Sequence, residues 1–396
     1  MWLPGFAPED DPIVVHGPVR APVIAEITPV IPGLHTPAMP TVAMVEAAPE
    51  PVIKATWPRL TADAIGAWGG KVTKFDNNVA AIKLLRELEA EDRDPSESER
   101  LVLQRYTGWG GLPAAFNLEQ NDTAWAARAL ELKTLLTPEE WESARASTPN
   151  AHYTDFPVLN AMWAAIQHFG FAGGRILEPA MGVGNFIGAM PTEIAQRSSI
   201  TGVELDNLSG RLARKLYASY GAQVLIQGFE KTKVPDGYFD LAISNVPFGA
   251  YKVAEVRHKP YAGWNIHNYF FGKALDLVRA GGLVAFVTST STLDRDYQDN
   301  QSAIRKHLNA HAEFVGAIRL PSGAFEKIAE TDVTTDIIFL RKRAKKVTED
   351  KATWLEIGAA PAEIRQDTLQ YKPMPINRSE ERRVGQECTY RRPQGL

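Results

Sequence analysis

The sequence predicts an α/β protein in which a mostly parallel sheet of seven strands follows a small helical region. From residue 150 onward, short apolar runs alternate with segments of helical period, as in a chain of alternating strands and helices. The runs are continuous rather than alternating, which indicates strands covered on both faces. A glycine-rich loop around Gly182 follows the first run directly, as where a strand turns into a helix.

Each strand is predicted from an apolar run bounded by turn residues, and each helix from apolar residues at three- and four-residue spacing. The expected strands are 175–180, 200–205, 223–228, 239–245, 282–289, 313–320 and 335–342. The expected helices are 156–169, 185–195, 207–220, 267–279 and 299–310. No helical period joins the last two strands, which favours an antiparallel final pair.

A helical region is expected over 60–149. Apolar residues recur on one face of 77–90, which predicts an amphipathic helix. Two later helices begin with predicted caps, one at Asp94-Pro95-Ser96-Glu97 and one at Thr137. A glycine-rich turn carrying a tryptophan, Tyr106-Thr-Gly-Trp-Gly-Gly-Leu-Pro113, lies between them.

Composition excludes several classes of protein. The 396 residues are 44% hydrophobic and 23% charged, which is typical of a globular protein. No apolar run is long enough to span a membrane, and no basic flank precedes an apolar run at the N-terminus as in a secretory signal. The single cysteine, Cys388, cannot form an internal disulfide, and the eight histidines lack the spacing of metal ligands. We therefore expect a cytoplasmic protein without membrane or metal partners.

Both ends of the chain differ from the middle. Residues 1–59 are expected to form a poorly ordered leader, because the first 50 hold 10 of the 27 prolines. The segment 378–396 is low in apolar residues, and its first part resembles the in-frame translation of a common sequencing adapter. We interpret it as read-through, in which case Cys388 is not native; a genuine charged tail is the alternative.

The glycine loop is the first candidate binding element. Glu178 ends a predicted strand, and Gly182 and Gly184 form the turn into the next helix, where a Cβ would obstruct a ligand or strain the backbone. Dinucleotide dehydrogenases use a related Gly-x-Gly-x-x-Gly loop, but the third glycine here, Gly188, is one residue off that spacing. The loop alone leaves two readings open, a nucleotide-type cofactor site and a merely tight turn.

Two acidic residues follow the next strands. Glu204 ends the second strand, where its carboxylate can accept both hydroxyls of a ribose; Asp206 is the alternative, although it can instead cap the next helix. Glu230 follows the third strand and can accept from an adenine amine, with Phe229 against the ring. For Glu230 the alternative is a solvated ion pair with a nearby lysine.

The motif Asn245-Val246-Pro247-Phe248 follows the fourth strand and is the most specific signal. An exocyclic aromatic amine is a poor nucleophile because its lone pair is delocalised into the ring. If the Asn245 side chain and the backbone carbonyl of Val246 or Pro247 accept its protons, the lone pair is freed for methyl transfer, while Phe248 stacks on the base. Together with the glycine loop, this motif predicts a pocket for S-adenosylmethionine beside a planar amine.

Two further stretches are candidate parts of the site. His152-Tyr153-Thr154 precedes the helix that leads into the first strand and is placed to close over the cofactor's carboxylate end, or else to cap that helix. The threonine- and serine-rich segment 288–294 ends the fifth strand and either contacts the substrate base or forms an ordinary turn.

In combination, these motifs resemble the N6-adenine DNA methyltransferases whose cofactor motifs precede the catalytic motif. The turn at Gly108-Trp-Gly-Gly111, with His152-Tyr-Thr and Leu177-Glu-Pro, is similar to the methylase part of large phage and plasmid methylase–helicase fusions. The resemblance covers about residues 70–345. It implies a Rossmann-like methyltransferase domain over 150–346 with a reversed last strand.

The resemblance also implies roles for particular residues. It places the catalytic motif at the adenine, and at the cofactor it places Tyr153, Thr154, Glu178, Pro179, Gly182, Gly184, Asn185, Phe186, Glu204 and Glu230. Val246 departs from the family, where proline is usual. Residues 347–377 would begin a truncated region that continues into a helicase-like or target-recognition part in the full-length protein.

The leading hypothesis is methylation of a flipped-out adenine in DNA, in a restriction–modification or phage setting. The alternatives are a methyltransferase for a glutamine side chain or an RNA base, and a non-catalytic binding module that retains the methyltransferase shell.

Overall fold

The computed structural model describes the helical region and the sheet almost completely. The described residues are 57–61, 64, 69–148, 154–249, 251–255, 261, 263–294, 301–320, 334–348, 352–355, 357–359 and 375–377. Most of the proline-rich leader, Tyr153 and the segment 378–396 lie outside the described residues. The predicted boundaries at 60, 150 and 347 stay predictions.

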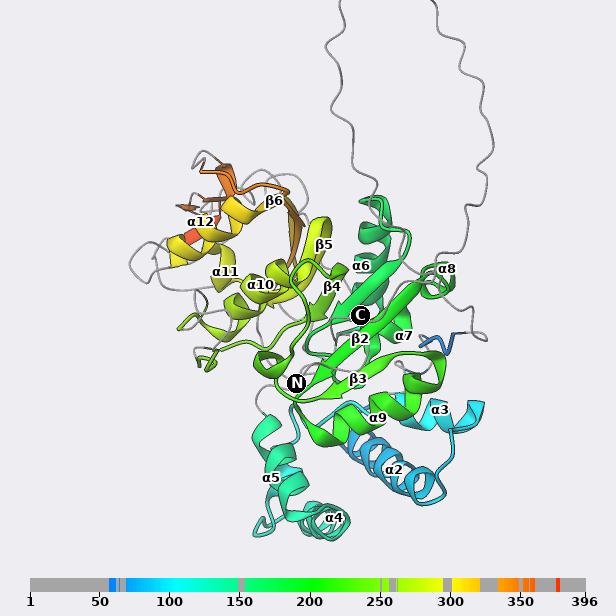
Figure 1. Ribbon diagram of the computed structural model, residues 1–396. Coiled ribbons are helices and arrows are strands. Elements are labelled where there is room, and N and C mark those ends of the chain that lie inside the picture. The colour runs from blue at the N-terminus through cyan, green and yellow to red at the C-terminus, as the bar shows by residue number, and fades with distance from the viewer. Residues whose placement is uncertain are drawn as a thin grey trace, which may run out of the picture. The chain divides into compact units, whose positions relative to one another are not determined.

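A seven-stranded sheet forms the centre of the fold, in the order β3-β2-β1-β4-β5-β7-β6 (Figure 1). Its strands are β1 (Gly174–Glu178), β2 (Ser198–Glu204), β3 (Gln223–Ile226), β4 (Phe239–Asn245), β5 (Val278–Ser289), β6 (Ala312–Arg319) and β7 (Thr335–Lys342). The first five strands pair in parallel, and β7 is antiparallel to both β5 and β6. The predicted fold class, including the reversed last strand, is confirmed.

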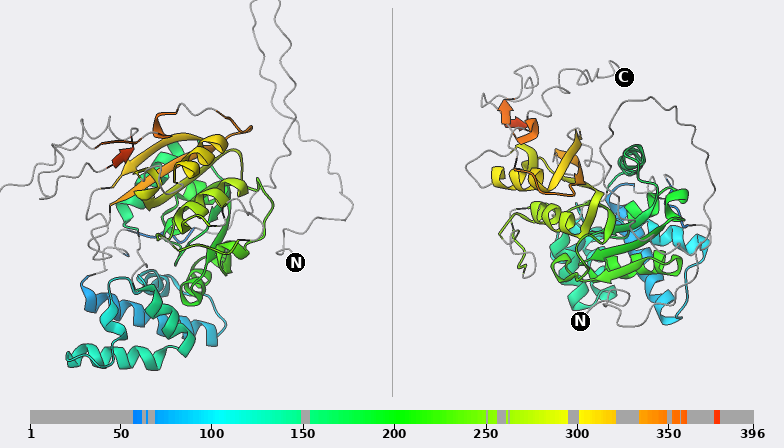
Figure 2. Two further views of the ribbon diagram at one scale, coloured as in Figure 1. Left: turned by 90° about the vertical axis from the view of Figure 1, so that its left-hand side faces the viewer. Right: turned by 45° about the horizontal axis from the view of Figure 1, so that its top comes forward.

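Helices before and between the strands cover both faces of the sheet (Figures 1 and 2). They are α6 (Phe156–His168), α7 (Asn185–Ala189), α8 (Thr192–Ala195), α9 (Asn207–Tyr217), α10 (Ile266–Leu277), α11 (Ser291–Asp294) and α12 (Gln301–His311). Among them, α9 packs on β2 and β3, and α10 packs on β5. A short second sheet pairs β8 (Ile357–Ala359) with β9 (Pro375–Asn377).

Among the elements after residue 150, two differ most from the sequence prediction. The helix expected over 185–195 is divided into α7 and α8 at Pro191, whose ring holds an extended backbone and provides no N–H to continue the first helix. Strand β5 begins at Val278, four residues earlier than expected, because Val278 pairs with Phe239 before a register shift. Both differences lie away from the carboxyl ends of β1, β2 and β4.

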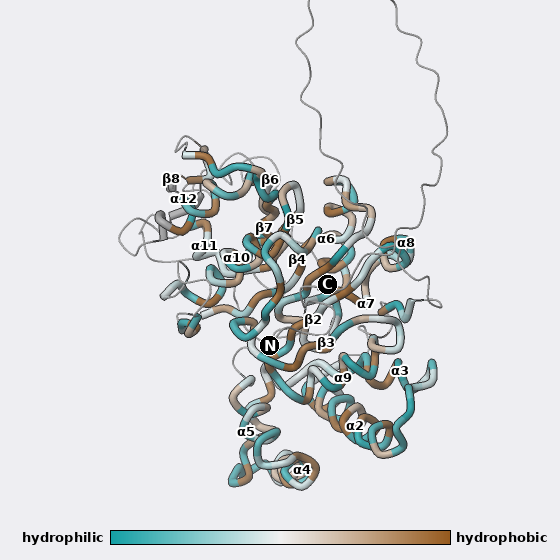
Figure 3. Tube along the Cα trace, in the orientation of Figure 1, coloured by the Kyte–Doolittle hydropathy of each residue, from teal (hydrophilic) through white to brown (hydrophobic). Residues whose placement is uncertain are grey.

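The core depends on apolar strands, as their continuous hydrophobic runs predicted. Leu241 and Ile243 of β4 and Val284 and Phe286 of β5 are fully buried. Figure 3 shows hydrophobic residues concentrated along the strands, whereas helices such as α2 alternate between hydrophilic and hydrophobic residues. Among the described residues, no helix has the length and apolar content that crossing a bilayer requires.

The helical region contains α2 (Lys71–Ala90), α3 (Glu97–Gln104), α4 (Thr123–Leu135) and α5 (Pro138–Ser147), with a short 3-10 turn at Pro113–Phe116 (Figure 2). The predicted Thr137 cap is present: its hydroxyl accepts a hydrogen bond from the Glu140 N–H, and the Glu140 carboxylate accepts one from the Thr137 N–H. The other cap lies two residues later than predicted, because Ser96 rather than Asp94 caps a helix that begins at Glu97, and Glu99 accepts from the Ser96 N–H. Helix α4, begun by an Asp122 cap, was not predicted.

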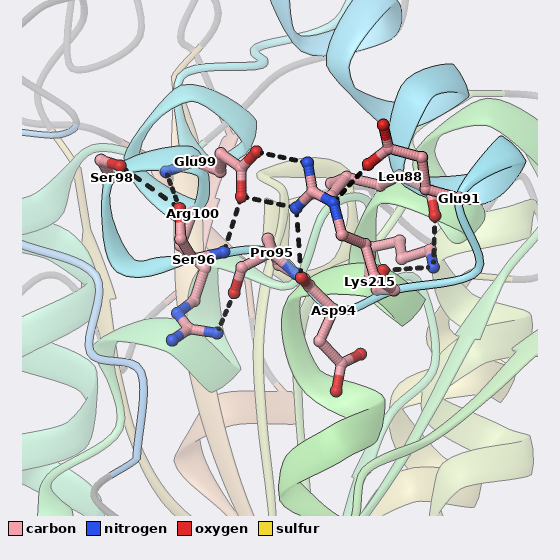
Figure 4. Close-up of polar contacts among 10 residues, drawn as sticks. Leu88, Glu91, Asp94, Pro95, Ser96, Ser98, Glu99, Arg100 and Lys215 are labelled. Carbon is pink, nitrogen blue, oxygen red and sulfur yellow. Dashed lines mark hydrogen bonds and ion pairs between the residues drawn. The ribbon is translucent and has the colours of Figure 1, made fainter.

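Helix α9 joins the helical region to the sheet through polar contacts. Lys215 Nζ donates to the carbonyls of Leu88 and Arg93, at 3.2 and 2.8 Å, where α2 turns towards α3 (Figure 4). Arg211 pairs with Glu89 of α2 and with Glu140 of α5. Arg211 lies one turn from the start of α9, which follows β2, so its ion pairs hold α5 and the end of α2 near the carboxyl end of that strand.

Candidate active site

A cavity of about 460 Å³ opens where the parallel strands β1, β2, β3 and β4 end. In open α/β sheets, the carboxyl ends of the strands are the usual place for a ligand. Twelve of the fourteen residues predicted for the site line this cavity: Thr154, Glu178, Pro179, Gly182, Asn185, Phe186, Glu204, Glu230, Asn245, Val246, Pro247 and Phe248. Of the other two, Tyr153 lies outside the described residues, and Gly184 does not line the cavity.

The glycine loop turns sharply between β1 and α7. Gly182 and Gly184 have φ values of +55° and +84°, a backbone region that side chains rarely adopt. A Cβ on Gly184 would also lie 2.6 Å from the ring of Tyr217. Gly184 therefore serves the turn and its packing, whereas Gly182 contributes to the cavity wall.

Glu204 is fixed beside the glycine loop. Its two carboxylate oxygens accept hydrogen bonds from the backbone N–H of Gly182, at 2.6 Å, and of Asp206, at 2.8 Å. Burial raises the pKa of Glu204 from 4.5 to about 7, and these N–H donors only partly oppose the shift. Asp206 instead caps α9 by accepting from the Ser209 N–H at 2.8 Å, which is the alternative role considered for it.

Glu178 places a second buried carboxyl on the cavity wall. Its side chain is buried, and its Oε2 has no hydrogen-bond partner among the described atoms. Burial raises its pKa well above 4.5, and the nearby Glu204 raises it further. A buried acceptor without a partner is costly, so a ligand that donates to Oε2 would relieve the cost.

The motif from Asn245 to Phe248 extends from the tip of β4 into the cavity. Asn245 Nδ2 donates to Thr154 Oγ1 at 3.1 Å, which orients the amide. The Val246 N–H donates to the Val287 carbonyl of β5 at 3.1 Å, so the β4–β5 ladder continues into the motif. Proline has no N–H, so the valine that departs from the family pattern makes a bond that proline could not.

Glu230 and Phe229 follow β3 at the other side of the cavity. Glu230 lines the wall, and among the described residues it forms no ion pair with Lys231 or Lys233. Phe229 packs against Phe270 with ring centroids 4.9 Å apart. The ammonium of Lys273 donates to the Phe229 carbonyl at 2.7 Å, which holds the start of this loop.

The segment 288–294 is not brought to the cavity wall. Thr288 and Thr292 are buried and lie 3.3 Å apart at their hydroxyls. Ser291 Oγ lies 3.0 Å from His267 Nε2, and Asp294 pairs with Arg319. These contacts favour the interpretation of this segment as an ordinary turn rather than as a contact to the substrate base.

Sequence reasoning missed several residues of the cavity. Leu205 lines it with a side chain that is 76% exposed, which leaves an apolar surface for a planar group beside Glu204. Its position directly after Glu204 was the available signal. The helical region adds Tyr106, Gly108, Ser143, Ala146 and Ser147, for which no pattern pointed to a ligand. Across the described ranges, no group of three or more potential metal ligands was found.

The strand order, with an antiparallel β7 inserted between β5 and β6 and a cavity at the ends of the parallel strands, decides the fold. The chain has the fold of a class I S-adenosylmethionine-dependent methyltransferase. Solved structures to which the chain is similar include a Listeria monocytogenes protein described as a class I S-adenosylmethionine-dependent methyltransferase (17% identity, TM-score 0.44, covering 74% of this chain and 92% of that one). Another is a type I restriction–modification system methyltransferase subunit from Streptococcus thermophilus (15% identity, TM-score 0.42, covering 71% of this chain and 82% of that one).

Sequence relatives agree with the predicted resemblance. The chain is 29% identical over 222 residues to defense against restriction protein B of Escherichia phage P1, covering 55% of this chain and 9% of that protein. It is 28% identical over 191 residues to type II methyltransferase M.XamI of Xanthomonas campestris pv. amaranthicola, covering 41% of this chain and 34% of that protein. It is 32% identical over 108 residues to modification methylase CviBIII of a Paramecium bursaria Chlorella virus, covering 26% of this chain and 27% of that protein. No protein-family model matches the chain.

The resemblance to DNA methyltransferases of the restriction–modification type is thereby confirmed. The chain spans 34% or less of the length of each of these relatives. A helicase part and an adenine specificity stay predictions.

Proposed function

We propose that the chain transfers a methyl group from S-adenosylmethionine to the exocyclic amine of adenine in DNA. The observation that carries the proposal is a single cavity lined both by the strand-end carboxyls Glu178 and Glu204 and by Asn245-Val246-Pro247-Phe248. A cofactor at the first set and a planar amine at the second would meet within one cavity. One relative is named a type II methyltransferase and another a modification methylase, which supports DNA as the substrate.

The residues present fit S-adenosylmethionine. The cavity volume lies within the range of about 300–1,000 Å³ that is usual for small-ligand sites. Glu204 provides a carboxylate for ribose hydroxyls, and Leu205 provides an exposed apolar surface for a ring. The partnerless Oε2 of Glu178 provides an acceptor for a cationic or N–H group. When bound, the cofactor would supply the methyl group as a sulfonium substituent.

The chain's own groups would orient and activate the amine. The Asn245 side chain and the carbonyl of Val246 or Pro247 would accept hydrogen bonds from the amine, so that its nitrogen becomes tetrahedral and its lone pair is no longer delocalised into the ring. The half-buried Phe248 would stack on the base and hold its plane. A base in duplex DNA would first have to leave the stack, at a cost that the cavity contacts must offset.

The partners and setting follow from the same proposal. DNA is the expected partner, with a further helicase-like or target-recognition region in the full-length protein. The similarity to a phage protein more than ten times as long as the matched segment supports such an extension. The cytoplasm of a bacterial or phage-infected cell is the expected location.

Labelled methyl transfer tests the proposal. The chain is incubated with methyl-labelled S-adenosylmethionine and with duplex DNA, single-stranded DNA, RNA and protein in separate reactions. We expect N6-methyladenine in the DNA nucleosides. Label in RNA or on glutamine would favour the second enzyme class, and cofactor binding without transfer to any substrate would favour a non-catalytic module.

Cofactor affinity is expected to rise about tenfold between about pH 6 and about pH 8. The pKa of Glu204 is raised to about 7, so in the lower part of this range the free protein holds a proton that competes with the ribose hydroxyls. Above it, the ionised carboxylate accepts them fully. The same raised pKa makes Glu204 favour folding at low pH and lose that contribution as pH rises through about 7. Titration calorimetry across the range measures the slope, and a flat profile would contradict the assignment of Glu204 to the ribose.

A further inference from the structure

We propose that the N-terminal helical region forms one wall of the cofactor site, with α5 and the Tyr106–Gly108 turn facing the adenosine half of S-adenosylmethionine. This inference rests on the proposed function and gives a role to the glycine-rich turn that the sequence singled out. The cofactor residues predicted from the sequence lie in the sheet domain or just before it, whereas these residues precede that domain in the chain.

Helix α5 presents one face to the cavity. Its lining residues Ser143, Ala146 and Ser147 are spaced three and four residues apart, so they lie on one side of the helix. Ser143 and Ala146 are exposed rather than packed into the core. Small side chains on this face leave the cavity open, and a large side chain would fill it.

A direct contact places this face beside the ribose position. Ser143 Oγ donates to Asp206 Oδ1 at 2.8 Å, and the Asp206 N–H in turn donates to the Glu204 carboxylate. The helix is also held through its buried Glu140, which accepts from Arg211 of α9 at 2.7 Å. The face of α5 therefore stands next to Glu204 and the exposed Leu205.

The glycine-rich turn is held as firmly as the helix. Asn78 of α2 is fully buried; its Nδ2 donates to the Gly108 carbonyl at 2.6 Å, and its Oδ1 accepts from the Thr107 N–H at 2.9 Å. Gly108 has a φ of +65°, which side chains rarely adopt. Trp109 is buried against Phe116, with ring centroids 5.4 Å apart. The turn thus has a fixed shape where Tyr106 and Gly108 reach the cavity.

The chemistry of this wall suits a nucleoside rather than a charged group. It offers hydroxyls from Ser143 and Ser147, the Ala146 methyl group and the Tyr106 ring, with no charged side chain among the five lining residues. The acidic acceptors Glu204 and Glu230 come instead from the end of β2 and from the turn after β3. Adenine and ribose need an apolar surface with a few polar contacts, which this wall supplies.

Replacing Ala146 with tryptophan tests the wall, and Ala127→Trp is the matched control. Both alanines are exposed on helices of the same region, but only Ala146 lines the cavity. Calorimetry measures binding of S-adenosylmethionine and of 5′-methylthioadenosine, which carries the adenosine half alone. We expect Ala146→Trp to weaken both at least about tenfold and to raise KM for the cofactor without lowering kcat at saturation, while Ala127→Trp leaves both unchanged.

The outcomes separate this inference from the proposed function. If the unaltered chain binds cofactor and Ala146→Trp binds it equally well, the wall assignment is wrong and the proposed function stands. If the unaltered chain binds no cofactor, the proposed function fails first. Thermal melting verifies folding, and should the tryptophan variant unfold, the smaller pair Ala146→Leu and Ala127→Leu gives the same comparison.

Discussion

Replacing Asn245 with alanine is expected to lower kcat about 10²–10³-fold and to leave the affinity for S-adenosylmethionine within about threefold. The reason is that, in the proposed function, the Asn245 side chain accepts a hydrogen bond from the substrate amine. This bond helps the amine hydrogens leave the ring plane, which frees the nitrogen lone pair for methyl transfer. Its hydrogen bond to Thr154 Oγ1, at 3.1 Å, holds it there in the free protein. Single-turnover methyl transfer measures the chemical step, and calorimetry measures binding.

A matched variant guards against a general effect of removing an asparagine. Asn207→Ala removes an exposed asparagine from the first turn of α9, outside the cavity, and should transfer methyl groups at the normal rate. Full activity of Asn245→Ala would remove the motif from the chemistry and favour a different acceptor site. Equal losses in both variants would point to instability instead.

Replacing Glu204 with glutamine is expected to weaken cofactor binding by about 10–100-fold, since charge-assisted hydrogen bonds contribute about 1.5–3 kcal/mol. Glutamine keeps the shape of the side chain but removes the negative charge. Its NH₂ group would also face the N–H of Gly182 or Asp206, which now donates to a carboxylate oxygen. The variant should bind with no pH dependence between about pH 6 and about pH 8, because the carboxyl whose pKa is raised to about 7 is gone.

Glu193→Gln is the control for Glu204→Gln, because Glu193 is an exposed glutamate on α8 outside the cavity. It should bind like the unaltered chain and keep the pH dependence. If Glu204→Gln keeps the slope, then another group, with Glu178 the first to consider, controls the pH dependence.

The strands of the sheet were predictable because each is encoded by its own short stretch of residues. Each buried strand is a short apolar run, and the two capped helices carry their own start signals at Ser96 and Thr137. The early start of β5 depends on the pairing of Val278 with Phe239, which no local pattern reveals. Helix α4 was missed because only Ala129 and Leu132 are buried on it, too few for a clear apolar stripe.

The difference between local patterns and tertiary contacts also explains which residues of the site could be predicted. Residues at strand ends were found because parallel strands bring their carboxyl ends to one edge of the sheet. The α5 wall was not found, because an exposed alanine and two serines carry no signal until tertiary contacts place them. Gly184 was expected at the ligand because a loop glycine can serve either close approach or a left-handed turn, and here the turn and the Tyr217 ring account for it.

The bond between the Val246 N–H and the Val287 carbonyl has a consequence for recognising such proteins. This hydrogen bond ties the tip of the motif to the neighbouring strand β5. The second residue of the motif, Val246, is therefore held by sheet pairing rather than by the rigid ring of a proline. A pattern search that requires two successive prolines after the asparagine would miss homologues with valine in the first of these positions. Searches that accept a β-branched residue at that position should find them, provided that the neighbouring strand extends far enough to accept its N–H.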